Sequence, residues 1–460
     1  MLMKEQQKIQ HLYFRACFGA SLEELEQQKN KNLKNIIKEV FDKASKIKNI
    51  EIVERPKIAD RNNLTEQERR LLRKESRQKI KNLNVLWLKQ MTEPQCALRE
   101  RMTLFWHNHF ACKTQNAYLT QKQNNLLRNY ALGKFGDLLH AISKDPAMLQ
   151  FLNNQQNRKE KPNENFAREL MELFTLGRGN YTEKDIKEAA RAFTGWGFDF
   201  SGEYVFRERQ HDFDSKTFFG KTGNFNGDDI INIILENPKT ALFIVRKIYT
   251  HFVNDKVDEA IVQDLASYFR KTNYDIKALL EKILSADWFY EQKNIGTHIK
   301  SPIELLVHYQ KFFGLDFEDE RSWLFVQKVL GQILFYPPNV AGWQEGKSWI
   351  DSSTLLFRMT LPDLIFGQKE VEINSKDDGD VDTEGLGKRE AKILQSRVDW
   401  NKITKHIKTS SQKEIFEKLQ NWLLPIASKN LSDDKIEGSG EVFIKNTIRQ
   451  LTTSPEFQLC

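Results

Sequence analysis

The sequence predicts an all-α or mainly α fold, with a large multi-helix globular body and a small β-like or irregular insert near residues 198–220. Three observations predict it. Apolar residues recur at helical spacing through almost the whole chain. Capping signals, such as Thr65 followed by Glu68, precede several of these segments. Residues 198–220 combine many aromatic side chains with little helical periodicity and are the best candidate for a β-hairpin or irregular insert.

In the first part of the chain, amphipathic segments predict a series of helices. The expected helices cover 20–45, a long segment from Thr65, a segment from Pro94 to about Cys112, and 116–131, 135–144 and 164–175. Gly177 is expected to end the last of these. Thr182 with Asp185 then fits the start of another helix, which ends before residue 195.

The second part continues with helices on both sides of Pro238 and over 258–271, 275–286, 301–313, 320–334, 388–424 and 440–452. Pro337-Pro338-Asn339 begins an aromatic loop that continues to Trp349. We therefore expect a main helical domain over 1–366, a mobile connection over 367–387, and a C-terminal helical portion over 388–460 packed on the main body.

Composition narrows the functional classes. The 460 residues are 40% hydrophobic and 11% aromatic, which suits a large core, and 70 basic against 63 acidic residues give a net charge of only +7. No nucleic-acid partner is expected. Proteins that bind nucleic acids usually concentrate basic residues on one face, and the net charge of this chain is only a mild excess. The four cysteines show no CxxC spacing, so neither a zinc ribbon nor a disulfide framework is expected.

The N-terminus lacks the apolar region of a secretory signal, and no run of 18 apolar residues predicts a membrane span. These observations predict a soluble, cytoplasmic protein. A start site assigned too far downstream would give the same beginning to a periplasmic or exported protein.

The densest group of polar side chains lies on the predicted helix at 164–175. On a regular helix five of them share an arc of about 140°, namely Glu164, Asn165, Arg168, Glu169 and Glu172. Two interpretations stay open. The face is a solvated one with ion pairs, or it lines a polar cleft in which Arg168 orients a substrate anion and Glu169 and Glu172 share a proton or bind a cation.

Two histidines near the end of the preceding apolar segment resemble a metal pair. Residues two apart on a helix point about 200° away from each other, so His107 and His109 ligate one ion only if the helix breaks. His109 falls on the apolar face of the helix expected from Pro94 to about Cys112. It is therefore interpreted as a core histidine held by a hydrogen bond, with direct catalytic use as the alternative.

His211 and Asp212, on the expected irregular insert, form the best acid–base candidate in the sequence. Lys216 adds a possible substrate contact. Trp343 and Trp349 are candidates for an aromatic wall that binds a ligand such as a sugar ring, or for the packing of a buried loop. A divalent metal is the one cofactor suggested, with candidate ligands His107, His109, His211 and Asp212. The sequence has no nucleophile elbow, P-loop or dinucleotide-binding fingerprint.

Short motifs in a fixed order resemble a bacterial family catalogued as domain of unknown function 1800 (DUF1800). They run from residue 11 nearly to the end of the chain: His11-Leu12 with Arg15-Ala16-Cys17-Phe18-Gly19, Trp106-His107-Asn108-His109-Phe110, residues 163–177, Tyr181-Thr182-Glu183, residues 188–196, His211-Asp212 with Lys216-Thr217-Phe218, Pro338-Asn339-Val340 with Gly342-Trp343 and Trp349-Ile350, and Ser454-Pro455-Glu456-Phe457.

The resemblance implies a helical protein but no activity. It also implies a sulfatase-like companion protein, since relatives are often encoded beside such a family and are often exported. This chain departs from the pattern in lacking an export signal and in having Asp351 where the family tends towards Asn.

Two functions follow from the sequence. The first is a hydrolase-like enzyme, acid–base or metal-assisted, whose polar cleft gathers His109, Glu169, Glu172, His211 and Asp212 as catalytic residues. Arg168, Asn165, Lys216, Trp343 and Trp349 would then bind the substrate. The alternative is a non-catalytic scaffold that works with the sulfatase-like companion.

Overall fold

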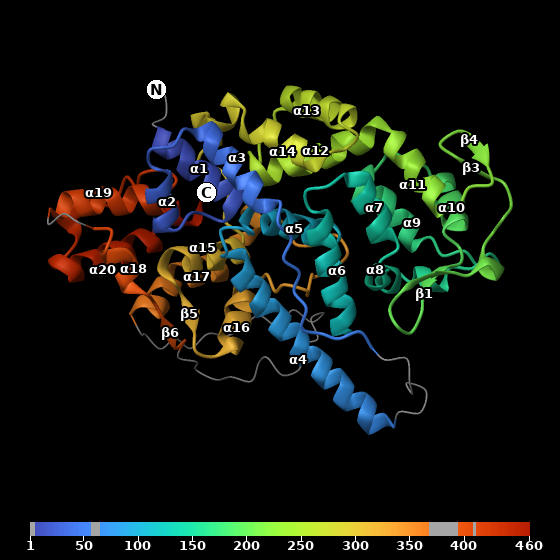
Figure 1. Ribbon diagram of the computed structural model, residues 1–460, viewed down its shortest axis with the longest axis horizontal. Coiled ribbons are helices and arrows are strands. Elements are labelled where there is room, and N and C mark those ends of the chain that lie inside the picture. The colour runs from blue at the N-terminus through green and yellow to red at the C-terminus, as the bar shows by residue number, and fades with distance from the viewer. Residues whose placement is uncertain (1–4, 57–64, 368–393, 408–410) are drawn as a thin grey trace.

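The computed structural model describes residues 5–56, 65–367, 394–407 and 411–460. Within these ranges the chain forms twenty α-helices and three small two-stranded sheets, as Figure 1 shows. The predicted mainly α fold is confirmed.

The helices of the first half follow one another closely. They are α1 (Glu5–Cys17), α2 (Leu22–Gln28), α3 (Leu33–Ala44), α4 (Glu66–Met91), α5 (Ala97–His109), α6 (Ala117–Tyr130), α7 (Phe135–Ser143), α8 (Pro146–Phe151), α9 (Asn165–Glu169) and α10 (Glu183–Ala192).

The second half adds α11 (Gly227–Glu236), α12 (Pro238–Phe252), α13 (Glu259–Lys271), α14 (Ile276–Leu284), α15 (Pro302–Phe313), α16 (Glu320–Leu330), α17 (Ser352–Phe366), α18 (Trp400–Thr404), α19 (Gln412–Leu423) and α20 (Gly440–Thr453). Apart from Gly367, the connection expected at 367–387 lies outside the described residues.

Local capping explains most helix starts. Thr65 with Glu68 and Thr182 with Asp185 form the expected capping boxes. The segment expected as one helix over 20–45 is two helices, because Asn32 caps a new start at α3. Helix α5 is shorter than predicted at both ends: it begins after Pro94, at Ala97, and stops at His109.

The predicted helix over 164–175 changes its winding in the middle. Its first part is α9, and Leu170–Thr175 continues as a π-helix. The Thr175 hydroxyl donates to the carbonyl of Leu170, five residues back. A π-turn rotates later side chains relative to a regular helix, so the face predicted from 100° per residue does not extend unchanged to Glu172.

The insert expected near 198–220 consists of two short antiparallel hairpins, which confirms its β character. Strand β1 (Trp196–Phe198) pairs with β2 (Tyr204–Phe206), and β3 (Lys216–Phe218) pairs with β4 (Lys221–Gly223). A third pair, β5 (Asp316–Phe317) with β6 (Ser396–Arg397), ties the C-terminal portion to the segment after α15.

Helix α5 lies near the middle of the molecule and α1 and α15 lie between it and α18–α20 at one end, while the hairpins β1–β4 lie at the other end, as Figure 1 shows. One continuous apolar cluster runs through all three regions. None of the helices in the described ranges is both long and apolar enough to cross a membrane.

Candidate functional site

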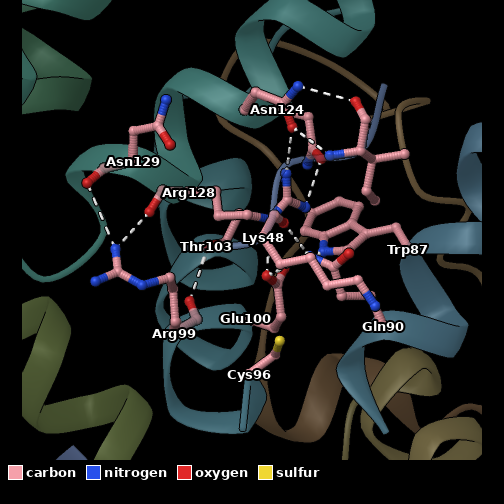
Figure 2. A network of polar contacts seen from close by, with 12 residues as sticks. Lys48, Trp87, Gln90, Cys96, Arg99, Glu100, Thr103, Asn124, Arg128 and Asn129 are labelled. Atoms are coloured by element: carbon pink, nitrogen blue, oxygen red, sulfur yellow. Dashed lines mark hydrogen bonds and ion pairs between the residues drawn. The ribbon is translucent and has the colours of Figure 1, made fainter. Parts of the chain in front are cut away.

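Glu100 and Arg128 form a buried charged network in which both charged groups have several hydrogen-bond partners. Glu100 is fully buried on α5 and accepts hydrogen bonds from Trp87, Gln90 and Arg128 at 2.6–2.9 Å. The other guanidinium nitrogens of Arg128 donate to neighbouring asparagine side chains. Figure 2 shows these contacts converging on Glu100. Such complete pairing is typical of a structural ion pair.

A second group of polar side chains, buried except for Glu345, is paired less completely. It gathers residues from α1, α5, α12, α15, the segment before α15 and the loop after α16. We call it the central polar cluster, and it comprises Arg15, Arg101, His251, His298, Glu304 and Glu345.

Arg101 and Glu304 form the deepest ion pair of the central polar cluster. Both side chains are almost completely buried, and Nη1 of Arg101 contacts Oε1 of Glu304. The other carboxylate oxygen accepts the backbone N–H of Ser301 at 2.5 Å and lies 3.3 Å from Nε2 of His298. Burial and the neighbouring arginines hold the pKa of His298 well below its usual range. The imidazole is therefore neutral, and it donates Nε2–H to Glu304.

Glu345 and His251 form a carboxylate–imidazole pair. Nδ1 of His251 lies 3.3 Å from Oε1 and 3.4 Å from Oε2 of Glu345. Burial alone would raise the pKa of Glu345, but His251, Asn108 and Arg101 together lower it to about 2. Burial lowers the pKa of His251. At neutral pH this pairs a carboxylate with a neutral imidazole, so Nδ1 carries the proton and Nε2 has a free lone pair.

Arg15 approaches the cluster from α1. Its Nη2 donates to the carbonyls of Val253 and Asn294 and to the Thr297 hydroxyl, at 2.7–3.2 Å. Burial lowers the pKa of Arg15, and the charges of Cys460 and Asp255, together with a hydrogen bond to Cys460, oppose that effect.

Several buried nitrogens of the cluster have no hydrogen-bond partner within the described part of the chain. They are Nε and Nη1 of Arg15, Nε and Nη2 of Arg101, Nε2 of His251 and Nδ1 of His298. Nη1 of Arg101 has only its ion contact with Glu304. Buried polar groups are nearly always hydrogen-bonded. The cluster therefore differs from the Glu100 network in offering free donors and free imidazole nitrogens.

Two glycines allow the Glu345 loop to reach the cluster. A Cβ on Gly342 would lie 2.3 Å from Oδ1 and 2.4 Å from the backbone oxygen of Asn108, and one on Gly346 would lie 2.9 Å from Oδ2 of Asp255. Both glycines have positive φ angles. The amide of Asn108 also bonds the main chain of Trp343 and the Glu345 carboxylate. The loop is thus fixed on α5.

The cluster lies close to the protein surface on one side. The Glu345 side chain is 32% exposed, whereas His251 and His298 are almost completely buried. The imidazoles are therefore shielded beneath a carboxylate that solvent can reach.

His109 lies on α5, and the ring of Phe105 is near both His109 and His251. The Phe105 ring is 6.2 Å from the imidazole of His109 and 5.2 Å from that of His251. Nε2 of His109 donates to the carbonyl of Phe174, so Nδ1 accepts from Nζ of Lys247 at 3.2 Å. Burial lowers the pKa of Lys247 to about 8. His109 is thus a buried histidine whose ring nitrogens are both hydrogen-bonded.

His107 faces a different part of the core from His109. Its Nε2 accepts the backbone N–H of Phe335 at 3.1 Å, and its ring packs against Trp87 and Trp343. Burial lowers the pKa of His107 to about 3. The two histidines contact separate partners, so the structure does not join them at a shared ion.

The polar face expected at 164–172 makes its contacts at the surface. Arg168 pairs with Glu164 and Glu183 at 2.9–3.1 Å. Glu172 accepts hydrogen bonds from Arg178 and Tyr181, both at 2.6 Å.

The remaining members of that face do not reach the histidines. Glu169 is half-buried, where burial and Glu172 raise its pKa, and Asn165 is exposed. Within the described chain, no side-chain hydrogen bond or ion pair links Arg168, Glu169 or Glu172 to His109 or His211. The structure therefore does not assemble the cleft expected from the sequence.

His211 and Asp212 point to different partners. Nδ1 of buried His211 donates to the carbonyl of Thr194 at 2.8 Å, while Asp212 accepts two bonds from the Arg191 guanidinium. Lys216 donates to the backbone oxygens of Asp212 and Asp214. Burial lowers the pKa of His211. These contacts hold the two hairpins onto α10, and Asp212 does not orient the imidazole.

Trp343 and Trp349 are both buried, with 6% and 5% of their surfaces exposed, so neither forms an open aromatic wall. No group of three or more His, Cys, Asp or Glu side chains suited to a metal ion occurs in the ranges that the structure covers.

A comparison with protein families assigns the chain. The family described as "Protein of unknown function (DUF1800)" matches residues 11–459. The chain belongs to the DUF1800 family. No curated protein and no solved structure matches it.

In this DUF1800 protein, sequence reasoning missed most of the central polar cluster. Arg15 belongs to one of the family motifs, but no sequence pattern distinguishes Arg101, His251, His298, Glu304 and Glu345 as site residues. One signal was present: Glu345 stands between Gly342 and Gly346 in an aromatic loop, which is typical of a backbone pressed closely against its neighbours.

Proposed function

We propose that this DUF1800 protein is an acid–base enzyme in which His251 is the general base and Glu345 its orienting carboxylate. The proposal is carried by one observation. A buried, neutral imidazole is held through Nδ1 by a carboxylate, while its Nε2 has no partner among the described residues. This arrangement suits proton abstraction. The carboxylate of Glu345 fixes the direction of the free Nε2 and determines which tautomer the imidazole of His251 adopts.

The chemistry that suits this pair best is hydrolysis. Nε2 of His251 would take a proton from a water molecule as that water attacks the substrate. The carboxylate of Glu345, 3.3 Å from Nδ1, would stabilise the imidazolium that forms. Arg15 and Arg101 stand close enough to lower the pKa of His251 electrostatically. The same two charges could stabilise negative charge that develops on the substrate.

The proposal is tested by the hydrolysis of p-nitrophenyl acetate, phosphate and sulfate by the full-length protein. His251→Asn is expected to lower kcat about 100-fold or more on whichever ester is turned over, because general acid–base catalysis contributes about 10²–10⁴-fold. Glu345→Gln should lower kcat less.

His140→Asn is the matched control. His140 is also paired with a carboxylate, Asp228, at 2.9 Å, but it lies outside the cluster. This variant should keep the wild-type rate. Equal rates for wild type and His251→Asn, or no turnover of any ester by the wild type, would contradict the proposal.

The second candidate function is a scaffold that binds a sulfatase-like companion. It is supported by large aromatic side chains exposed on the hairpin insert, with Phe200 68%, Phe213 57% and Phe206 41% exposed. Exposed aromatic residues that are grouped in this way are typical of interaction surfaces. Replacing Phe200 and Phe213 with Ser should abolish co-purification of the companion from native cells while leaving the melting temperature unchanged. Unchanged co-purification would contradict this alternative.

A further inference from the structure

We infer that a surface pocket between the β1–β2 hairpin and the start of α6 binds a sugar that carries a carboxylate or sulfate group. The pocket has a volume of about 580 Å³, which lies within the range of about 300–1,000 Å³ that small-molecule sites occupy. None of its lining residues belongs to the central polar cluster. The inference therefore stands independently of the proposed acid–base reaction.

The hairpin that forms one wall of this pocket is fixed on α6. Nζ of Lys122 donates to the carbonyl of Gly202, in the turn of the hairpin, and to the Glu203 carboxylate, both at 2.7 Å. A Cβ on Gly202 would lie 2.9 Å from Cδ2 of Leu119 and 3.2 Å from Cε1 of Tyr118. The turn is therefore packed tightly against α6, and the pocket is formed before a ligand arrives, as small-molecule sites usually are.

One part of the pocket lining is apolar and rich in rings. Its apolar residues are Pro56, Tyr118, Leu119, Phe198, Phe200 and Val205. The ring of Phe200 is largely exposed to solvent, so the core does not occupy it and a ligand can contact it. The C–H groups on one face of a sugar ring form an apolar surface that packs against aromatic rings of this kind. The apolar lining thus favours a ligand with one apolar face.

The polar part of the lining offers both donors and acceptors. The side chains of Gln155, Arg158 and Gln210 make no hydrogen bond to another residue in the described ranges. Asp199 accepts all of its side-chain hydrogen bonds from described residues at Oδ1, which leaves Oδ2 free. A glutamine amide both donates and accepts, as does a sugar hydroxyl group. These side chains therefore match a ligand with several hydroxyl groups.

The two arginines of the pocket add a preference for an acid group. Arg207 donates through Nη2 to the carbonyl of Phe198 at 2.9 Å, and its Nε and Nη1 have no partner among the described residues. The guanidinium group of Arg158 is free altogether within the same ranges. Because Asp199 is the one carboxylate in the lining, the pocket keeps a positive charge. Guanidinium groups bind the oxygens of carboxylate and sulfate groups through paired hydrogen bonds.

A sugar acid is the ligand class that satisfies all of these groups together. An anion without hydroxyl groups would leave Oδ2 of Asp199 without a donor. A neutral sugar would leave the charge of Arg158 and Arg207 unpaired. An acidic sugar supplies donors for the carboxylate, an anion for the guanidinium groups and an apolar face for the rings.

The inference is tested by isothermal titration calorimetry of the full-length protein with D-glucuronate, D-glucose 6-sulfate and D-glucose at constant ionic strength. Wild-type protein should bind at least one of the two acidic sugars about tenfold or more tightly than glucose, because glucose cannot form charge-assisted hydrogen bonds with the arginines. The tighter of the two acidic sugars identifies the acid group.

Two variants with matched controls place the ligand in this pocket. Arg158→Gln should weaken the binding of the preferred acidic sugar about tenfold, and Phe200→Ser should weaken it about fivefold. Arg209→Gln and Phe213→Ser remove an arginine and a ring of the same hairpin insert that do not line the pocket, and both should bind like wild type. All four side chains are exposed, so all four variants should fold.

Several results would overturn the inference. Neither acidic sugar binding to the wild type would do so, as would glucose binding as tightly as both of them. Equal affinity in Arg158→Gln, Arg209→Gln and wild type would place any binding outside this pocket. Acetate and uridine monophosphate are titrated in parallel, and tighter binding of either than of both acidic sugars would assign the pocket to another class of ligand.

Discussion

Nδ1 of His251 lies 3.3 Å from Oε1 of Glu345, although the two residues are 94 positions apart in the sequence. The contact joins the last turn of α12 to the loop after α16. It gives the protein a buried imidazole with a fixed tautomer, directly beneath a carboxylate at the surface.

Replacing Glu345 with Gln should make the protein less sensitive to acid. The pKa of Glu345 is about 2 in the folded protein, below the value of about 4.3 for an unfolded chain. Its ionised form therefore stabilises the fold above the unfolded pKa, and this contribution is lost as the pH falls from about 4.3 towards 2. After allowance for partial exposure, the loss is on the order of 1–2 kcal/mol.

Urea unfolding of wild type and Glu345→Gln at a series of pH values measures this effect. The difference in unfolding free energy between the two proteins should shrink as the pH falls through that window. A difference that stays constant from neutral pH to pH 3 would show that Glu345 is not held ionised by its neighbours.

Gly342→Ala should displace the Glu345 loop. The new Cβ would meet both the side chain and the backbone oxygen of Asn108, at 2.3 and 2.4 Å. The φ angle of +80° also disfavours alanine. A loss of about 2–4 kcal/mol is expected from overpacking and left-handed strain together.

Gly331→Ala is the control for the clash. Gly331 has a similar φ of +89°, but a Cβ there meets nothing within 4 Å, so strain alone should cost about 1–2 kcal/mol. Thermal unfolding compares the two variants. Equal losses would mean that the approach of the loop to Asn108 is not tight.

Glu100→Ala should destabilise the fold strongly without changing the central polar cluster. It leaves Arg128 buried without its carboxylate and removes the acceptor of Trp87 and Gln90. Breaking a buried ion pair from one side costs about 3–5 kcal/mol. Arg178→Ala, which breaks the exposed pair with Glu172, should leave the melting temperature nearly unchanged. A Glu100→Ala protein with wild-type stability would refute the structural role of this network.

Lys247 should titrate near pH 8. Burial lowers its pKa to about 8, and the charge of Glu345 partly opposes the shift. The pKa of Lys247 should therefore fall further in Glu345→Gln. Carbon-13 NMR of reductively methylated protein follows this titration, and Lys247→Arg identifies the resonance. A pKa at the usual lysine value, or one that is unaffected by Glu345→Gln, would place Lys247 outside the influence of the cluster.

The sequence alone determined the local structure. Helical periodicity and the capping boxes at Thr65 and Thr182 predicted helices that form, and the loss of periodicity after residue 197 predicted the hairpins. These signals are readable because they depend on residues within a few positions of each other. The π-turn at Leu170–Thr175 was not predicted, since the same side chains fit a regular α-helix equally well.

Only the tertiary structure decided which polar residues share a site. The carboxylates at 164–172 bind residues that are close to them in the sequence. Glu172, for example, accepts hydrogen bonds from Arg178 and Tyr181. Arg15, Arg101, His251 and Glu345 lie in separate segments that carry no local sign of one another. Their meeting depends on how α1, α5 and α12 pack and on the glycines that seat the Glu345 loop. Packing of this kind joins residues without regard to sequence distance, so periodicity and spacing contain no record of it.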